Sequence, residues 1–268
     1  MDKTINFFSV SADWIVPYNP SSTAQDVDYE QYILPFIFFS LYSSKNAKCE
    51  IVVNRKGYIE EHQEALDTLV KVMGYRFKIR EEELTQKADV SRFLLEPSIK
   101  CDYTYISDID ILITEKNIER YYAKIFKEID IPYSNVQRKG RSLLTGTFCA
   151  ETDRYYTKEM KAKMKEYLEK DLQGVRDEYV LYEMMFQVHP LPSQEMSKNV
   201  DRYRPIHGIH NNLRRPPTPP SYQPDFPSWD MTNEKRERFL TISKTTEYKS
   251  MYPYFTDSYK NILNKIRL

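Results

Sequence analysis

Residues 103–113 read YTYISDIDILI: an apolar run, two aspartates separated by one residue, and a second apolar run. The first run, within residues 102–106, is predicted to be a strand buried in a sheet. Asp108 and Asp110 then lie where the chain leaves the sheet, at a point that the sheet no longer shields from water. Two carboxylates in that place can bind a hard divalent cation, directly or through water. An Asp pair can equally cap an ordinary turn, so the motif alone leaves both interpretations open.

The segments around this stretch alternate between strand-like and helix-like patterns. Further strands are predicted at residues 5–10, 49–53, 75–79 and 142–150, and residues 111–113 are a further apolar run. Helices are predicted at residues 28–42, 60–73, 89–95, 117–129, 157–172 and 175–188. Such alternation indicates an α/β fold with a mixed, mainly parallel sheet flanked by helices. Ligands of these sheets bind beyond the carboxyl ends of the strands, where the two aspartates are predicted to lie. Residues 229–268 resume helical patterning and are predicted to form a C-terminal helical extension.

Composition excludes several classes of function. The chain has 268 residues with 39 basic and 39 acidic side chains, so it carries no formal net charge. Nucleic-acid binders normally show a basic excess that neutralises phosphates, and we expect no nucleic-acid partner. Neither GxGxxG nor GxxxxGK[ST] occurs, which excludes the Rossmann and P-loop fingerprints. The three cysteines form no CxxC pair, and no signal peptide or spanning segment is recognisable, so a cytoplasmic location is expected.

The motifs around the aspartates resemble glycosyltransferase family 8, whose members have the GT-A fold. RFLLEP at residues 92–97, followed by YISDIDILI at residues 105–113, is similar to a family pattern in which a basic helix residue precedes a strand ending in a YLDADILV-like string. Residues 11–13 (SAD), together with Tyr18, resemble the family's first strand and turn, which hold the nucleoside. HGIHNNLRRP at residues 207–216 is a looser match to the C-terminal HxxGxxKPW motif, with leucine where the motif has glycine.

This resemblance implies a metal site and a donor site. Mn²⁺ or Mg²⁺ would be held by Asp108, Asp110 and a histidine, and an imidazole ligand favours Mn²⁺. Either His207 or His210 fits the looser motif, and His210 is favoured because two arginines follow it at about the expected interval. The residues implied to bind the nucleotide-sugar are Ser11, Asp13, Tyr18, Arg92, Asp108, Thr145, Gly146, Arg214 and Arg215. The arginines among them would bring positive charge to the phosphates.

Asp177 and Glu178 open a predicted helix, and the family has an Asp-Gln pair at the corresponding place. By that resemblance, Asp177 would bind hydroxyls of the acceptor or donor, and Glu178 would lie near the anomeric carbon. A carboxylate there can act as a general base for the acceptor hydroxyl, or can stabilise or trap an oxocarbenium-like centre. The helix dipole alone also favours acids at a helix start, so both interpretations stay open.

The resemblance therefore implies a metal-dependent glycosyltransferase with a UDP-sugar as the expected donor. The acceptor would be a glycan or a lipid-linked saccharide in the synthesis of bacterial surface polysaccharide, such as capsule or lipopolysaccharide. We expect a catalytic domain at residues 1–228, made of a nucleotide-binding half at 1–115 and an acceptor half at 116–228, followed by the extension at 229–268. The basic, aromatic-rich extension fits either peripheral contact with the inner face of the cell membrane or helices docked on the domain itself.

Two other functions stay open from the sequence. The string SDIDIL at residues 107–112 also resembles nucleotidyltransferases of the polymerase-beta type. Those enzymes need an upstream Gly-Ser turn that holds the nucleotide phosphates, yet no glycine occurs between Gly74 and Gly140. The other alternative is a non-catalytic module that has the same fold and binds a glycan or another partner.

Overall fold

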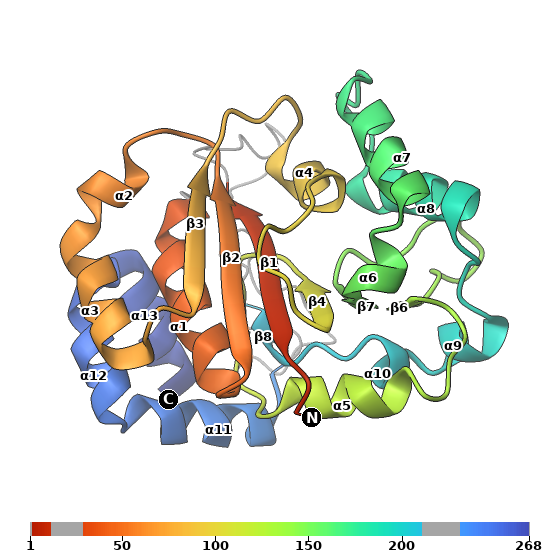
Figure 1. Cartoon of the computed structure of the whole chain (residues 1–268). Helices are drawn as coiled ribbons and strands as arrows, with labels where there is room; N and C mark the ends of the chain where they lie inside the picture. The colour runs from red at the N-terminus through yellow and green to blue at the C-terminus, as the bar shows by residue number, and fades with distance from the viewer. Residues whose placement is uncertain (1, 12–28, 211–230, 268) are drawn as a thin grey trace, which may run out of the picture.

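The structure is a computed structural model, and it describes residues 2–11, 29–210 and 231–267 (Figure 1). Its centre is a six-stranded sheet in the order β3-β2-β1-β4-β7-β6. The first four strands in that order are parallel: β3 (Phe77–Glu81), β2 (Ala47–Val53), β1 (Ile5–Ser11) and β4 (Tyr103–Ile106). The other two, β7 (Phe148–Glu151) and β6 (Tyr133–Ser134), are antiparallel to their neighbours. The sheet is therefore mixed and mainly parallel, as predicted.

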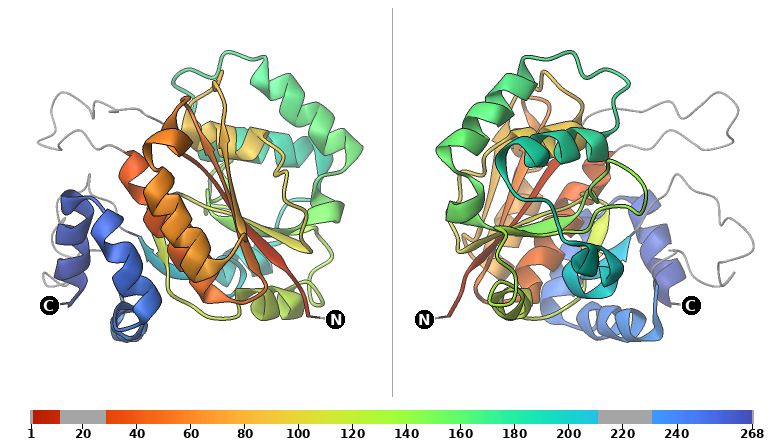
Figure 2. Two further views of the ribbon diagram at one scale, coloured as in Figure 1. Left: turned by 60° about the vertical axis from the view of Figure 1, so that its left-hand side comes forward. Right: turned by 90° about the vertical axis from the view of Figure 1, so that its right-hand side faces the viewer.

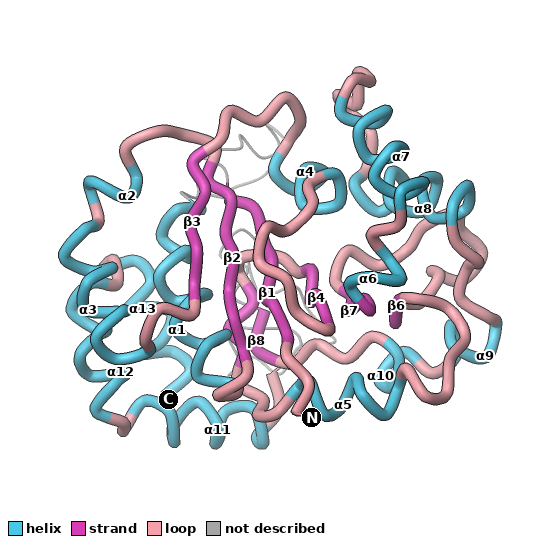
Figure 3. The backbone as a smooth tube through the Cα atoms, in the orientation of Figure 1, coloured by secondary structure: helices cyan, strands magenta, loops and turns pink. Residues whose placement is uncertain are grey.

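Alternate side chains of β1 point into two different apolar cores, one on each face of the sheet. Ile5 and Phe7 share a core with α1 (Ile33–Ser43) and α3 (Gln63–Met73). Phe8 and Val10 share the other core with α4 (Ala88–Leu94), α7 (Lys158–Leu168) and α8 (Asp177–Val188). Helices accordingly lie on both sides of the strands (Figure 3). The α/β class with flanking helices is confirmed.

The C-terminal helical extension lies beside α1 and α3 (Figure 2). It consists of α11 (Asn233–Ser243), α12 (Thr246–Met251), the 3₁₀ helix η2 (Tyr252–Tyr254) and α13 (Asp257–Arg267). Phe239, Tyr248 and Tyr259 are buried in the same core as α1. These aromatic side chains of the extension therefore pack on the domain itself, as one of the two interpretations expected. Within the described part of the chain, every helix is too short or too polar to cross a bilayer.

Some predicted elements end elsewhere than the sequence pattern indicated. The strand predicted at residues 142–150 begins only at Phe148, and before it Thr145 bonds both to the carbonyl of Val136, at 3.3 Å from its backbone nitrogen, and to the side chain of Asn135. The Thr145 hydroxyl donates to Oδ1 of Asn135, and its carbonyl accepts a hydrogen bond from Nδ2 of Asn135 at 3.0 Å. The helix predicted at residues 60–73 is divided at His62 into α2 (Tyr58–Glu61) and α3.

A second, two-stranded sheet places residues 111 and 210 opposite each other. It pairs β5 (Ile111–Ile113) antiparallel with β8 (Gly208–His210), and Ile111 faces His210 in the register. A Cβ atom at Gly208 would lie 2.1 Å from the carbonyl oxygen of Leu112, so the close approach of these strands requires glycine. The sequence pattern did not predict β8.

Five short helices complete the described part of the fold. They are η1 (Tyr29–Tyr32), α5 (Ile118–Ile125), α6 (Thr152–Tyr155), α9 (Gln194–Lys198) and α10 (Val200–Tyr203). The division into a nucleotide-binding half, an acceptor half and an extension stays a prediction.

Candidate metal and active site

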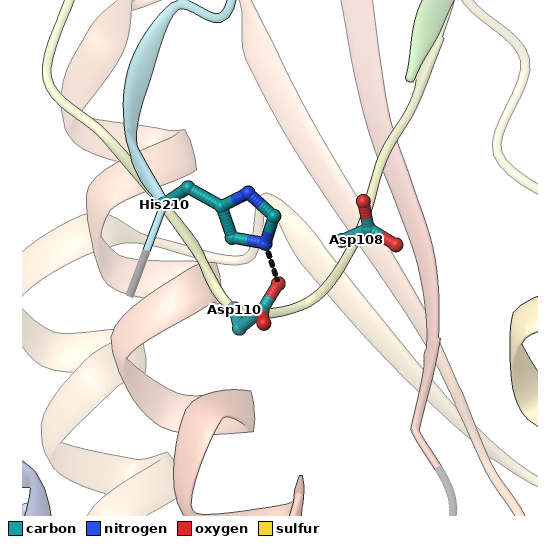
Figure 4. A group of neighbouring side chains, drawn as sticks. All are labelled: Asp108, Asp110 and His210. Carbon is teal, nitrogen blue, oxygen red and sulfur yellow. Dashed lines mark ion pairs between the residues drawn. The ribbon is translucent and has the colours of Figure 1, made fainter. Parts of the chain in front are cut away.

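Three potential metal ligands converge beyond the carboxyl end of β4. Asp108 and Asp110 lie in the loop between β4 and β5, and His210 ends β8. One ligand atom from each lies within 4.8 Å of the others (Figure 4). The Nε2 atom of His210 is 3.2 Å from Oδ1 of Asp110. The β5–β8 pairing thus brings a histidine from residue 210 onto the aspartate pair.

The surroundings of Asp110 fit a bound cation. Asp110 is 4% exposed, and its Oδ1 atom makes no hydrogen bond within the described residues. A buried carboxylate oxygen left in that state costs free energy unless a positive partner compensates it. When Nε2 of His210 carries no proton, it and Oδ1 present lone pairs toward the same space, as two ligands of one cation do. Two carboxylates and an imidazole form a donor set suited to Mn²⁺ or Mg²⁺.

Arg92 joins this cluster to the start of α8. Arg92 is 5% exposed, and its guanidinium donates to Oδ1 of Asp108 through Nη1 and to Oδ2 of Asp177 through Nη2, the latter at 2.7 Å. Burial alone would lower the pKa of Arg92, but the neighbouring aspartates outweigh burial and raise it. The side chain therefore stays charged and links the two carboxylates.

The two carboxylates on Arg92 differ in their affinity for a proton. Burial acts to raise the pKa of Asp108, but the charges of Arg92 and His210 outweigh it and hold that pKa below its ordinary value. For Asp177, burial is the larger effect and raises the pKa above its ordinary value despite Arg92. Asp108 is thus the more readily ionised group, as a metal ligand must be. Asp177 is the better proton acceptor of the two.

Thr145 and Gly146 are both predicted to bind the nucleotide-sugar, and of these two Gly146 lies beside the Arg92–Asp177 pair. A Cβ atom there would be 2.5 Å from Nη2 of Arg92 and 3.4 Å from Oδ2 of Asp177. Glycine therefore leaves the space that the Arg92–Asp177 pair occupies. The hydroxyl of Thr145 is directed at buried Asn135 instead.

Glu178 is held by arginines at the other side of the α8 N-terminus. Its Oε2 accepts from Nε of Arg138 at 2.8 Å, and its Oε1 accepts from Nη2 of the same guanidinium. Nη2 of Arg176 is 3.4 Å from Oε2. Arg138 thus engages both carboxylate oxygens of Glu178, and the expectation that Glu178 lies near the anomeric carbon stays a prediction.

His207, the other histidine predicted as a metal ligand, lies outside the group formed by Asp108, Asp110 and His210. Its side chain is 1% exposed, and both ring nitrogens have protein partners. Nδ1 is 2.5 Å from Oε2 of Glu115, and Nε2 is 3.1 Å from the hydroxyl oxygen of Tyr122. Glu115 also pairs with Nη1 of Arg238 on α11 at 2.9 Å. The His207 ring therefore fastens the start of β8, while His210 faces the aspartates.

Two groups of predicted residues remain to be placed. Ser11 ends β1, is buried, and has a hydroxyl without a hydrogen-bond partner among the described residues. Asp13, Tyr18, Arg214 and Arg215 lie outside the described residues.

The sequence pattern missed one charge near the aspartates, that of Arg204. Its positive charge helps to lower the pKa of Asp108. The only available signal was its place three residues before His207, at the start of the motif at residues 207–216.

The chain is distantly similar to several solved structures. No family model and no curated protein matches the chain. The apo-form glycosyltransferase GlyE of Streptococcus pneumoniae is similar at 12% identity over 96% of this chain and 64% of that chain, with a TM-score of 0.49. A second GlyE structure gives 13% identity over 72% of this chain and 45% of that one, with a TM-score of 0.44. A 4-diphosphocytidyl-2C-methyl-D-erythritol synthase from Anaerococcus prevotii gives 10% identity over 74% of this chain and 96% of that one, with a TM-score of 0.41.

Proposed function

We propose that this protein is a metal-dependent glycosyltransferase that moves a sugar from a nucleotide-sugar, expected to be a UDP-sugar, to a glycan or lipid-linked saccharide. The observation that carries the proposal is the convergence of Asp108, Asp110 and His210 beyond β4. The resemblance of the motifs at residues 92–97 and 105–113 to family 8 supports the same activity. We place it in bacterial surface-polysaccharide synthesis, as that resemblance implies.

In this proposal Asp108, Asp110 and His210 hold Mn²⁺ or Mg²⁺. The bound cation would neutralise the diphosphate that departs as the glycosidic bond breaks. Arg92 keeps a second positive charge beside Asp108, inside the protein, where screening by water is weak. Further donor contacts are proposed from Ser11, Asp13, Tyr18, Thr145, Gly146, Arg214 and Arg215.

Asp177 is the carboxylate proposed to act on the acceptor. Its raised pKa and its position on Arg92 suit a group that orients the acceptor hydroxyl and takes up its proton. Arg92 fixes the direction of the Asp177 side chain through Nη2. Glu178, held by Arg138, would keep the α8 N-terminus in place beneath Asp177.

A thermal-shift screen tests the proposed function against its alternatives. The protein is heated with UDP, UDP-sugars or nucleoside triphosphates, each with Mn²⁺, Mg²⁺ or EDTA. We expect UDP to raise the melting temperature only with a divalent cation, because ligands that bind the folded state stabilise it. Asp110→Asn should abolish this shift, whereas Asp257→Asn, at a carboxylate that is 97% exposed, should not.

Other outcomes of the screen identify the alternatives. Stabilisation by triphosphates with Mg²⁺ but not by UDP with Mn²⁺ indicates a nucleotidyltransferase. Stabilisation by neither indicates a non-catalytic module. In a separate activity assay, full sugar transfer in the presence of EDTA would contradict the metal-dependent mechanism.

Peripheral membrane contact through the extension, at the inner face of the cell membrane, is part of the proposal. Co-sedimentation of the full chain with anionic and with neutral vesicles tests it. Binding to anionic but not to neutral vesicles supports the contact. If the protein binds neither kind of vesicle, the proposed contact is wrong.

A further inference from the structure

α8 carries a face of exposed aromatic side chains that its packing leaves uncovered. Tyr179 is 42% and Phe186 64% exposed, and Tyr182 lies between them, half-buried. The rings of Tyr182 and Phe186 are almost parallel, with an interplanar angle of 6° and centroids 6.1 Å apart. With Glu183, these residues recur at helical spacing, so they share one side of α8, which we call the α8 face. The opposite side of the helix supplies Val180, Leu181 and Met184 to the core.

Exposed aromatic rings in this arrangement indicate a ligand-binding surface. Folding gains little from a phenylalanine ring left mostly in water, and grouped exposed apolar side chains commonly mark a binding surface. In the right-hand view of Figure 2, α8 runs across the side of the molecule that faces the viewer.

A basic rim adjoins the α8 face at its N-terminal end. It consists of Arg138, Lys139 and Arg141 in the turn between β6 and β7, and of Arg176 just before α8; all four are exposed. Arg138 and Arg176 both contact Glu178, so one carboxylate meets two guanidinium groups. A positive charge therefore remains there, in a chain that has none overall.

The rim, the α8 face and the candidate active site meet at the N-terminal end of α8. Glu178 lies four residues before Tyr182, one helical turn away. It directly follows Asp177, which is bonded to Arg92. The chain that forms the basic turn continues to Gly146, against the same Arg92–Asp177 pair. A ligand bound along α8 thus begins beside the carboxylate proposed to act on the acceptor.

We propose that the α8 face and the basic rim bind the acceptor, and that this acceptor is a saccharide bearing an anionic group, a phosphate or a carboxylate. This inference rests on the proposed glycosyl transfer and specifies its acceptor. Sugar rings lie on the aromatic side chains, as apolar ring faces do on aromatic groups. Glu183 accepts hydrogen bonds from sugar hydroxyls. The rim pairs with the oxyanion through charge-assisted hydrogen bonds.

The mixture of charges on this surface favours a saccharide over the other ligands that aromatic and basic residues bind. Glu183 interacts with Tyr179 and raises the pKa of its hydroxyl, so a carboxylate stands within the α8 face. That negative charge opposes an anionic lipid surface and a phosphate backbone. A polyhydroxylated ring, in contrast, uses a carboxylate, a guanidinium and an aromatic ring together.

The test is ligand-observed saturation-transfer NMR on the full chain with paired saccharides. The carboxylate pair is 3′-sialyllactose and lactose, and the phosphate pair is N-acetylglucosamine 6-phosphate and N-acetylglucosamine. We expect saturation of at least one anionic sugar, on its ring protons, and weaker saturation of its neutral counterpart. The pair that responds identifies the anionic group.

Matched variants then locate the site. Phe186→Ala should weaken binding about threefold to tenfold, the range expected for the loss of one ring contact. The double variant Lys139→Gln/Arg141→Gln should abolish the preference, so that the anionic sugar binds no more tightly than its neutral counterpart. Tyr75→Ala, which removes a ring that is 91% exposed, and Lys124→Gln/Lys127→Gln, at exposed residues of α5 and of the turn that follows it, serve as controls and should change neither.

Several outcomes overturn the inference. The first is that neither anionic sugar shows saturation, and the second is that the control variants lose as much sugar binding as the α8 variants. The third is that inorganic phosphate displaces the sugar completely and binds equally well to Phe186→Ala. Anionic vesicles that bind through Phe186 would replace the saccharide by a membrane surface. Stabilisation by UDP and Mn²⁺, measured on the same samples, distinguishes failure of this inference from failure of the proposed function. If that stabilisation persists while sugar binding is independent of α8, only this inference fails.

Discussion

At the scale of single residues, Arg92 is the side chain on which the candidate site depends. Its guanidinium donates hydrogen bonds to both Asp108 and Asp177. Burial and neighbouring charges together lower the pKa of Asp108 and raise that of Asp177. The motif at residues 92–97 indicated that Arg92 belongs to the site. That it bridges two aspartates was not predictable, because the bridge joins residues that are 16 and 85 positions away.

We predict that Asp108 titrates below the ordinary value of 3.8 and Asp177 above it. The lowered pKa of Asp108 gives a stabilising contribution that is present above its unfolded pKa and lost as pH falls through its folded pKa. The raised pKa of Asp177 gives a stabilising contribution that is present below its unfolded pKa and is lost as pH rises through its folded pKa. Arg92→Gln should raise both values, because the Arg92 charge lowers both.

Carbon-13 NMR of the aspartate carboxyl groups measures these titrations directly. The interpretation fails if Asp177 loses its proton before Asp108, or if both resonances are unmoved by Arg92→Gln.

Two glycine substitutions should separate the site from the fold. At Gly146 an added methyl meets the tip of Arg92, which can move, so Gly146→Ala should cost about 1 kcal/mol or less while it displaces Arg92 and lowers transfer. At Gly208 the methyl meets the backbone of Leu112, which cannot move alone, so Gly208→Ala should cost about 1–3 kcal/mol. Urea unfolding of both variants checks the order, and equal destabilisation would contradict it.

At the scale of elements, the β5–β8 pair assembles the metal site from two distant parts of the chain. The apolar run before the aspartates predicted β4 correctly, and the apolar run after them forms β5. Three residues, Gly-Ile-His, form β8, and such a short segment has no periodicity of its own. Its pairing depends on Gly208 and on the buried His207, which are tertiary features.

The contacts of His207 predict how firmly β8 is held. Glu115→Gln should lower the free energy of unfolding by about 1–3 kcal/mol, because it removes the charged partner of a buried imidazole. It should also weaken Mn²⁺ binding, because β8 carries His210. Arg238→Gln, at a partly exposed side chain, should cost about 1 kcal/mol or less.

The exposed pair of Arg202 and Glu128 provides the control for these variants. Arg202→Gln should leave Mn²⁺ affinity unchanged, although it too removes a charged partner. Equal effects of Arg202→Gln and Glu115→Gln would show that the His207 contacts have no particular role in holding the site.

At the scale of the whole molecule, the C-terminal extension completes one of the two cores. The ring of Phe239 is fully buried against Phe39 of α1, with ring centroids 6.2 Å apart, and α12 contacts α3. Helical periodicity predicted the helices of the extension. It left open whether they pack on the domain or rest on a membrane, because aromatic residues suit both environments.

We therefore predict that Phe239→Ala lowers the free energy of unfolding by about 3–5 kcal/mol, as for other large side chains removed from a core. Circular dichroism during urea unfolding gives the value. A change below about 1 kcal/mol would mean that the extension is not part of the folding unit.

The central claim is that Asp108, Asp110 and His210 bind one divalent cation, and isothermal titration with Mn²⁺ tests it most directly. We predict one ion per chain, with affinity reduced about tenfold or more in Asp110→Asn and in His210→Asn, and unchanged in the control His62→Asn. Wild-type affinity in both of the first two variants, or no binding to the native chain, would contradict the account.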